Sequence, residues 1–212
     1  ENAISGSVYN IIPIPANMQP GKGTFTLTEQ GAKVYVQGAS AAFSNYIQQS
    51  ALKCKVTKKR SDANIAIVVG SKASKKIATE GYSLTVSPKR IDVVASTEQG
   101  AFYAIQTLLQ MTQMGELRTI DCCTVADEPR FSYRGLHFDV SRHFFSKEFL
   151  IKQIDAMALL KLNRMHLHLT DGAGWRLQID RYPRLTSFAA WRPAKTWQEW
   201  TKCETKYCDQ ND

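Results

Sequence analysis

The sequence predicts an α/β protein in two parts: a small α/β domain over residues 1–126 and, over 127–212, the first β-α-β part of a (β/α)₈ barrel. Three observations support this prediction. The first part mixes short strand patterns with amphipathic helix patterns. A polar segment interrupted by Pro129 then indicates a boundary. After it come a strand, a helix and a strand, the order that builds a parallel sheet.

Four segments of the first part have strand patterns. TFTLTE (24–29) and KVYVQG (33–38) alternate apolar and polar residues, which is typical of strands with one buried face. NIAIVVG (64–70) is a continuous apolar run and predicts a strand buried on both faces. Residues 80–96 predict a hairpin that turns at the Ser-Pro-Lys of 87–89.

Two helices are predicted in the first part. The segment SAAFSNYIQQS (40–50) has a helical pattern. A second helix has Ser96 as its cap, and Gln99 three residues later completes a capping box. We expect Gly115 to end this helix, because glycine readily adopts the left-handed conformation found after helix ends.

The second part contains two strands with the same alternation. RGLHFDVS (134–141) and RMHLHLT (164–170) flank a helix over 146–162 that Ser146 caps. Side chains alternate between the two faces of a strand, so each strand has one apolar face and one that becomes polar toward its end. In a (β/α)₈ barrel the apolar face packs on outer helices, and polar groups at the carboxyl ends of the strands build the active site.

Charge and hydropathy limit the kinds of partner that we expect for this chain. The net charge is +8, and the excess lies mostly in KCKVTKKR (53–60) and SKASKK (71–76). These segments contain no aromatic residues that would stack on bases, so we expect a solvated lysine-rich face and no nucleic-acid partner. No apolar run approaches the roughly 18 residues that would span a bilayer, so we expect no membrane span.

The five cysteines allow one local pairing. Cys203 and Cys208 could form a small disulfide loop in an oxidising compartment. Cys122 and Cys123 are adjacent, and we expect them at a strand end. With Cys54 they do not supply the second tight pair that a zinc site would need, so no zinc site is predicted.

Arg142 and Asp171 come just after the two strands of the second part, where barrel enzymes carry their working residues. The pair suits recognition of vicinal hydroxyls, because the guanidinium donates to two oxygens while the carboxylate accepts. It could equally be a structural salt bridge between two loops. Trp175 could cover a sugar face or pack on the barrel end.

The two histidines of the second strand allow a metal hypothesis. His166 and His168 share a face, so both imidazoles could reach one ion, with Asp171 adding a carboxylate, as in metal-dependent barrel hydrolases. The alternative is that both rings form hydrogen bonds within a polar layer of the barrel.

A stretch of some fifty residues resembles the start of the catalytic barrel in the β-N-acetylhexosaminidases of glycoside hydrolase family 20. The matching elements are Arg-Gly before an apolar strand, Asp-x-Ser-Arg-His, Lys-Leu-Asn, His-x-His-Leu-x-Asp, Gly-Trp-Arg and Tyr-Pro-x-Leu-Thr, all within residues 134–186. The first part resembles the small non-catalytic domain that precedes this barrel. The chain departs from many relatives at Leu167, where they have tryptophan, and at Gly172, where they have aspartate.

The resemblance implies roles for the matching residues. Arg142 would bind hydroxyls of the terminal N-acetylhexosamine, and Asp171 would orient a histidine that contacts the catalytic acid. His166 and His168 would be supporting groups, with no metal or organic cofactor. The partner would be an N-acetylhexosamine-terminated glycan. By resemblance we expect export in a bacterium, to the periplasm or outer surface, with any signal peptide already removed.

In this family hydrolysis is substrate-assisted and retaining, and an Asp-Glu pair in a His-x-Gly-Gly-Asp-Glu pattern lies on a later strand. This chain contains a single Asp-Glu, Asp127-Glu128, and no glycines precede it. A complete barrel takes about 250 residues, whereas 82 follow position 130. We therefore expect a truncated barrel that needs its remainder for a complete site and is inactive by itself. A non-catalytic sugar-binding module is the other alternative.

Overall fold

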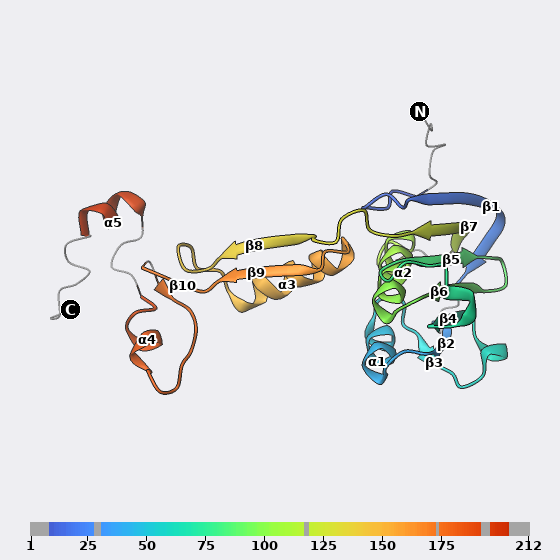
Figure 1. The fold of residues 1–212 in the computed structure, drawn as a ribbon, viewed down its shortest axis with the longest axis horizontal. Helices are drawn as coiled ribbons and strands as arrows, with labels where there is room; N and C mark the ends of the chain where they lie inside the picture. Colours follow the sequence, from blue (N-terminus) through green and yellow to red (C-terminus); the bar gives the residue numbers. More distant parts are fainter. Residues whose placement is uncertain (1–8, 28–30, 117–118, 173, 192–195, 204–212) are drawn as a thin grey trace, which may run out of the picture. The chain divides into compact units, whose positions relative to one another are not determined.

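The computed structural model describes residues 9–27, 31–116, 119–172, 174–191 and 196–203 (Figure 1). Contacts within the chain define two compact units. The first comprises the chain up to Arg134 together with Asp155–Leu162, and the second comprises Gly135–Ile154 and the chain from Asn163 onward. The domain boundary after residue 126 stays a prediction.

Within the described residues of the first unit, the strands form one sheet in the order β1-β7-β5-β6-β4-β2-β3. The pairs β1–β7, β7–β5 and β5–β6 are antiparallel. The pairs β6–β4, β4–β2 and β2–β3 are parallel, so β6 joins the antiparallel half of the sheet to the parallel half. Their bounds are β1 Asn17–Thr26, β2 Lys33–Gln37, β3 Lys55–Val56, β4 Ile65–Val69, β5 Tyr82–Val86, β6 Ile91–Ala95 and β7 Thr119–Asp127.

Three of the predicted strand patterns have the expected structure. All five residues of β4 are buried, as a continuous apolar run predicts. β2 lies within the predicted 33–38 segment. β5 and β6 form the predicted hairpin, and Ser87 fixes its turn: the Ser87 hydroxyl donates to the Arg90 carbonyl at 2.6 Å and accepts from the Arg90 N–H at 3.1 Å.

No strand was predicted over residues 124–127, but these residues belong to β7 rather than to a polar linker. Cys122 and Cys123 therefore lie inside a strand, both 3% exposed, and not at a strand end. The reason is that β7 hydrogen-bonds to β1 on one side and β5 on the other. Thr124 and Ala126 face solvent, so the segment looks polar although Val125 between them is fully buried. The strand β1 likewise begins earlier than predicted, at Asn17.

Two helices pack on each other and complete the core of the first unit. α1 (Ala41–Gln49) lies where 40–50 predicts it, and α2 (Glu98–Met111) contacts the central strands. The Tyr46 ring of α1 lies 5.1 Å from that of Phe102, and Gln106 donates to the Tyr46 hydroxyl at 2.6 Å. The side chains that are less than 2% exposed come from the strands, the helices and their connections, and include Ile47, Leu52, Ile65, Ile67, Leu84, Ile91, Ile105 and Leu108.

The predicted start and end of the second helix were wrong by a few residues. Thr97 is the cap, and its hydroxyl accepts from the Gly100 N–H at 3.3 Å. Ser96 instead donates to the Ala78 carbonyl at 2.6 Å, so its hydroxyl is directed away from the helix. The helix ends at Met111. Gly115 has the left-handed backbone expected of a terminating glycine (φ 87°) but follows an irregular turn.

The second unit contains the predicted pair of parallel strands. β8 (Gly135–Asp139) and β9 (Arg164–His168) pair in register, and α3 (Lys147–Leu159) connects them along the chain. The Ser146 hydroxyl accepts from the Phe149 N–H at 3.2 Å, which confirms the predicted cap. The second unit also contains the short elements β10 Thr170–Asp171, β11 Gly174–Trp175, α4 Arg184–Ser187 and α5 Trp197–Cys203. The first unit also contains the 3₁₀ turns η1 Arg60–Asp62 and η2 Lys72–Ser74.

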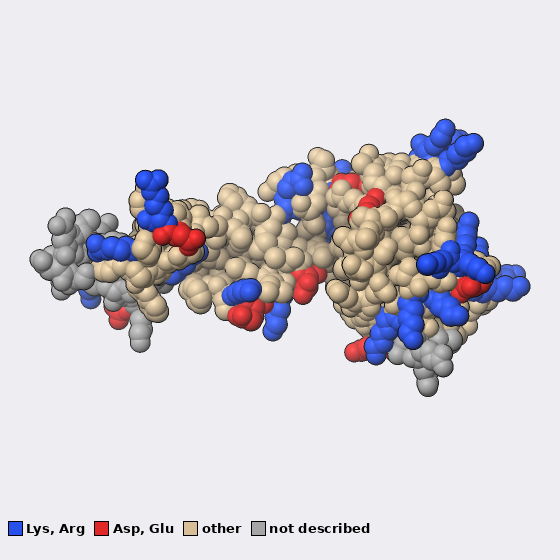
Figure 2. Space-filling model, turned by 90° about the horizontal axis from the view of Figure 1, so that it is seen from below, with Lys and Arg blue, Asp and Glu red and all other residues tan. Residues whose placement is uncertain are grey.

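The lysine-rich segments are exposed, as predicted. All the lysines of 53–60 and 71–76 face solvent, and Figure 2 shows Lys and Arg side chains gathered on the first unit. In the part of the chain that the structure describes, no helix is both long and apolar enough to cross a bilayer. Cys54, Cys122 and Cys123 are free thiols. Cys208 lies outside the described residues, so its suggested pairing with Cys203 stays a prediction.

Candidate active site

The candidate site lies at the carboxyl ends of β8 and β9. The parallel register sets His137 beside His166 and Asp139 beside His168. The rings of His137 and His166 meet edge to face with centroids 4.6 Å apart, and the His137 and His168 centroids lie 6.0 Å apart. The side chains that sequence alternation assigned to one polar face are therefore neighbours in space.

The turn after β8 is shaped by Asp139. Its Oδ1 accepts from the backbone N–H groups of Ser141 at 3.1 Å and Arg142 at 2.9 Å. Its Oδ2 lies 2.6 Å from Nη1 of Arg142. The Arg142 backbone and side-chain donors favour the ionised carboxylate and lower the pKa of Asp139 to about 2.

The structure brings Arg142 and Asp171 together, as their positions after neighbouring strands predict. Nη2 of Arg142 lies 2.7 Å from Oδ2 of Asp171, so the guanidinium contacts one carboxylate at the end of β8 and one that follows β9. The Arg142 side chain is 58% exposed. Hydrogen bonding to Asp139 and the charges of both carboxylates raise the pKa of Arg142.

Asp171 is held by three donors. Its Oδ1 accepts from the Gly172 N–H at 2.7 Å, and its Oδ2 lies 2.9 Å from Nε2 of His168 as well as contacting Arg142. The Gly172 and His168 bonds lower the pKa of Asp171, so it is ionised at neutral pH. Because an ionised carboxylate only accepts, Nε2 of His168 carries the proton.

This bond bears on the metal hypothesis. Nε2 of His168 is directed to Asp171, and His166 contacts the ring of His137. Among the described residues, no three His, Cys, Asp or Glu side chains are grouped so that they could hold a metal ion. The described geometry therefore gives the metal-dependent hydrolase alternative no support.

Ser141 and Arg176 brace the loops around the site, and sequence reasoning missed both roles. The buried Ser141 hydroxyl donates to the Gly174 carbonyl at 2.6 Å. Arg176 donates to the Val140 carbonyl at 3.0 Å and to that of Ala190. The available signal was the Gly-Trp-Arg motif itself, in which the Arg176 guanidinium lies against the backbone of Gly174: a Cβ added there would be 2.7 Å from it.

Trp175 is part of the β10–β11 hairpin. Its indole N–H donates to the Leu177 carbonyl at 2.5 Å, and its backbone N–H donates to that of Ala189 at 2.9 Å. The described contacts of Trp175 therefore hold the loop in place. Its suggested role as cover for a sugar face stays a prediction.

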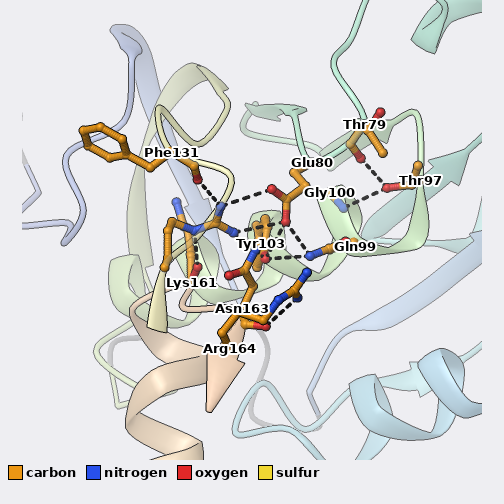
Figure 3. Close-up of polar contacts among 11 residues, drawn as sticks. Thr79, Glu80, Thr97, Gln99, Gly100, Tyr103, Phe131, Lys161, Asn163 and Arg164 are labelled. Atoms are coloured by element: carbon orange, nitrogen blue, oxygen red, sulfur yellow. Dashed lines mark hydrogen bonds and ion pairs between the residues drawn. The ribbon is translucent and has the colours of Figure 1, made fainter. Parts of the chain in front are cut away.

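The first unit contains a separate polar network and a cavity. Arg134 donates to both oxygens of Glu80 at 3.1 Å, to the Tyr103 hydroxyl at 2.7 Å and to the carbonyls of Phe131 at 2.6 Å and Lys161 at 2.8 Å (Figure 3). These residues, except Glu80, line a cavity of about 670 Å³ with mostly apolar walls. None of its lining residues is one of the predicted site residues. Since its charged groups bond to one another, the network is structural.

The chain matches two family models. Residues 8–128 match "Glycosyl hydrolase family 20, domain 2" and residues 131–211 match "Glycosyl hydrolase family 20, catalytic domain". The chain is 38% identical over 164 residues to β-hexosaminidase B of Pseudoalteromonas piscicida. This alignment covers 76% of the chain and 20% of the Pseudoalteromonas protein. The curated relatives are thus much longer, and the chain spans about a fifth to a quarter of their length.

Solved structures are similar over most of the chain. The β-N-acetylhexosaminidase of Bacteroides fragilis has a TM-score of 0.78 at 28% identity, covering 93% of this chain and 42% of that one. The family 20 exo-β-N-acetylglucosaminidase of Vibrio harveyi in complex with N-acetylglucosamine has a TM-score of 0.73 at 30% identity, covering 86% and 29%. The mixed α/β fold is therefore similar to that of these structures.

Proposed function

This chain belongs to glycoside hydrolase family 20, and on that basis we propose that the protein is a β-N-acetylhexosaminidase acting on the non-reducing ends of glycans. The substrate is a terminal N-acetylglucosamine or N-acetylgalactosamine. The observation that carries the proposal is the 2.7 Å contact between Arg142 and Asp171, at the two positions of the family motif that resemblance assigns to the sugar site.

We propose that β8, α3 and β9 are the first β-α-β part of a (β/α)₈ barrel, with the small domain ending near residue 126. The parallel β8–β9 register supports this, because adjacent barrel strands are parallel. The catalytic-domain match, which begins at residue 131, also supports it. Polar groups at the strand ends then lie at the mouth of the barrel, where the sugar binds.

In this proposal Arg142 binds the sugar through its planar guanidinium. Five N–H donors in a fixed fork can engage two carboxylates and sugar hydroxyls at once. Asp139 and Asp171 hold the guanidinium from either side, so it needs little reordering when the sugar arrives. His168 completes the group by donating to Asp171.

In the proposed substrate-assisted reaction the acetamido oxygen of the substrate attacks the anomeric carbon while the glycosidic bond breaks, and a glutamic acid protonates the leaving oxygen. An aspartate orients the acetamido group, and the resulting glutamate then takes a proton from the water that opens the oxazolinium intermediate. Asp127-Glu128 does not fit this task. Asp127 accepts from Lys161 at 2.8 Å and from Tyr82 at 2.9 Å, and its side chain is 11% exposed, so it is committed to a buried ion pair. We therefore propose that the 212-residue chain alone is inactive.

The experiment compares two proteins. One is the 212-residue chain, and the other continues it into a complete family 20 catalytic domain. We expect the longer protein to release p-nitrophenol from p-nitrophenyl N-acetyl-β-glucosaminide without added metal or cofactor, and the shorter one to release none. Activity of the short chain would refute the fragment proposal. An inactive long protein that still binds N-acetylglucosamine would indicate a sugar-binding module instead.

We also propose that the protein is exported to the periplasm or outer surface of a bacterium, where it would encounter polymeric glycans. Cell fractionation followed by immunodetection tests this part. Recovery of the protein from the cytosol alone would contradict it.

A further inference from the structure

Asp139, the last residue of β8, contacts both the backbone and the side chain of Arg142. One of its oxygens accepts from two successive backbone N–H groups, those of Ser141 and Arg142. The other forms a 2.6 Å ion pair with the side chain of Arg142. A single carboxylate thus fixes both the backbone and the guanidinium of the same arginine.

The simplest alternative is an ordinary surface salt bridge, which contributes little because two flexible side chains must be ordered to form it. Asp139 differs in two respects. Its side chain is 23% exposed, and the two backbone bonds already order it before the arginine side chain is considered. The entropic cost of the ion pair therefore falls mainly on Arg142.

Asp171 supplies the second fixed point. It contacts the other terminal nitrogen of Arg142 at 2.7 Å and is itself held by His168 and Gly172. A planar guanidinium that contacts a carboxylate at each terminal nitrogen has a defined plane as well as a defined position. Losing one of these contacts removes one of the two carboxylates that define this plane.

We propose that Asp139 is a positioning residue that holds the Arg142 guanidinium in the orientation that the terminal amino sugar requires. The proposal rests on the proposed function, because it takes Arg142 as the residue that binds the sugar. Asp139 acts through Arg142 and does not itself contact the substrate.

The expected kinetic effect follows from this role. Hydroxyl contacts made by Arg142 exist in both the bound substrate and the transition state, so disorder of the guanidinium weakens both. Such a loss raises KM more than it lowers kcat. We expect Asp139→Asn to raise KM on the order of 10-fold while kcat stays within about 3-fold of the wild-type value.

Asp139→Asn is the informative variant because the amide retains an oxygen that can accept from the Ser141 and Arg142 N–H groups. It removes the charge and replaces the second oxygen with a donor that cannot bind the guanidinium. Asp92→Asn is the matched control: Asp92 also pairs with arginines, Arg60 and Arg90 at 3.0 Å, but belongs to the first unit. We expect it to leave KM and kcat unchanged.

The measurement has two arms. Steady-state kinetics on p-nitrophenyl N-acetyl-β-glucosaminide use the chain continued into a complete catalytic domain. Arginine side-chain NMR on the ¹⁵N-labelled 212-residue chain reads the guanidinium directly, because ordered Nη groups give separate resonances and freely rotating ones average. We expect separate Arg142 resonances in the wild type and averaged ones in Asp139→Asn.

The outcomes separate the two proposals. A wild-type protein that cleaves nothing overturns the hexosaminidase function, and the NMR arm still decides whether Asp139 orders Arg142. An active Asp139→Asn enzyme with wild-type KM overturns the positioning role. Averaged Arg142 resonances in the wild type, or unchanged ones in Asp139→Asn, overturn it as well.

Discussion

Lys161 and Asp127 form a buried ion pair in the first unit, and we predict that breaking it by removing one partner is strongly destabilising. The Lys161 side chain is 5% exposed and that of Asp127 is 11% exposed, with Nζ and Oδ2 2.8 Å apart. Lys161 also donates to the Tyr82 hydroxyl at 3.0 Å. Lys161→Met keeps the length of the side chain but leaves the Asp127 carboxylate without its cation.

The magnitude follows from what Asp127 retains. Breaking a buried pair by removing one partner costs about 3–5 kcal/mol. Asp127 still accepts from the Ala16 N–H at 3.0 Å and from Tyr82 at 2.9 Å, so we expect the low end, about 3 kcal/mol at pH 7. The double variant Lys161→Met/Asp127→Asn is the control. It buries no charge, so it should recover most of this loss.

The effect depends on pH through Asp127. Burial alone would raise the pKa of Asp127, but the Lys161 ammonium and its hydrogen bond outweigh burial and lower it. In the wild type this carboxylate therefore adds stability above its unfolded pKa of about 4, and the gain is lost as pH falls through the lower folded value. In Lys161→Met, burial is no longer opposed by the ammonium and raises the pKa of Asp127. Protonation of Asp127 at low pH then removes the buried charge that destabilises the variant. The difference between the unfolding free energies of the two proteins should therefore narrow as pH falls from the raised pKa of the variant, above about 4, to the lowered pKa of the wild type.

Urea unfolding followed by tyrosine near-ultraviolet circular dichroism reports mainly the first unit, which contains six of the eight tyrosines. All four tryptophans lie in the second unit, so tryptophan fluorescence supplies an internal comparison. A loss below about 1 kcal/mol at pH 7 would refute the assignment of this pair as buried and coupled. An equal difference at pH 7 and pH 3.5 would refute the pKa argument.

Four further substitutions test the fold of the first unit by the same urea titration. Thr97→Ala removes the observed helix cap and should cost about 1 kcal/mol, whereas Ser96→Ala should cost less; the reverse order would favour the cap expected from sequence. Gly100→Ala places a Cβ 2.2 Å from the Gly81 carbonyl oxygen and should cost on the order of 1–3 kcal/mol; a neutral result would contradict this close approach. Leu84→Ala should cost about 2–5 kcal/mol because Leu84 is fully buried in the sheet, and a cost under 1 kcal/mol would contradict that placement.

Local patterns predicted much of this fold. Period-two alternation identified β8 and β9, and with it the shared polar face of His137, His166 and His168. Chain order then placed Arg142 and Asp171 at neighbouring strand ends, where they form an ion pair. These predictions succeeded because parallel neighbours align the ends of their strands, so residues distant in sequence reach the same edge.

The failures share one physical cause: partners that are remote in sequence. β7 looks like a polar linker until β1 and β5 supply its hydrogen bonds. Thr97 rather than Ser96 caps α2 because the Ser96 hydroxyl donates to the Ala78 carbonyl instead. Arg176 donates to the carbonyl of Val140, 36 residues earlier, which no local pattern records.

The most direct test of the central claim is the kcat/KM of Arg142→Ala toward p-nitrophenyl N-acetyl-β-glucosaminide, in the chain continued into a complete family 20 catalytic domain. Because Arg142 is exposed and outside the core, its loss should leave the melting temperature nearly unchanged. We predict that kcat/KM falls by at least about 100-fold, the scale of losing charge-assisted hydrogen bonds to the substrate. A folded Arg142→Ala enzyme with wild-type kcat/KM would show that this pair of strand ends does not bind the sugar.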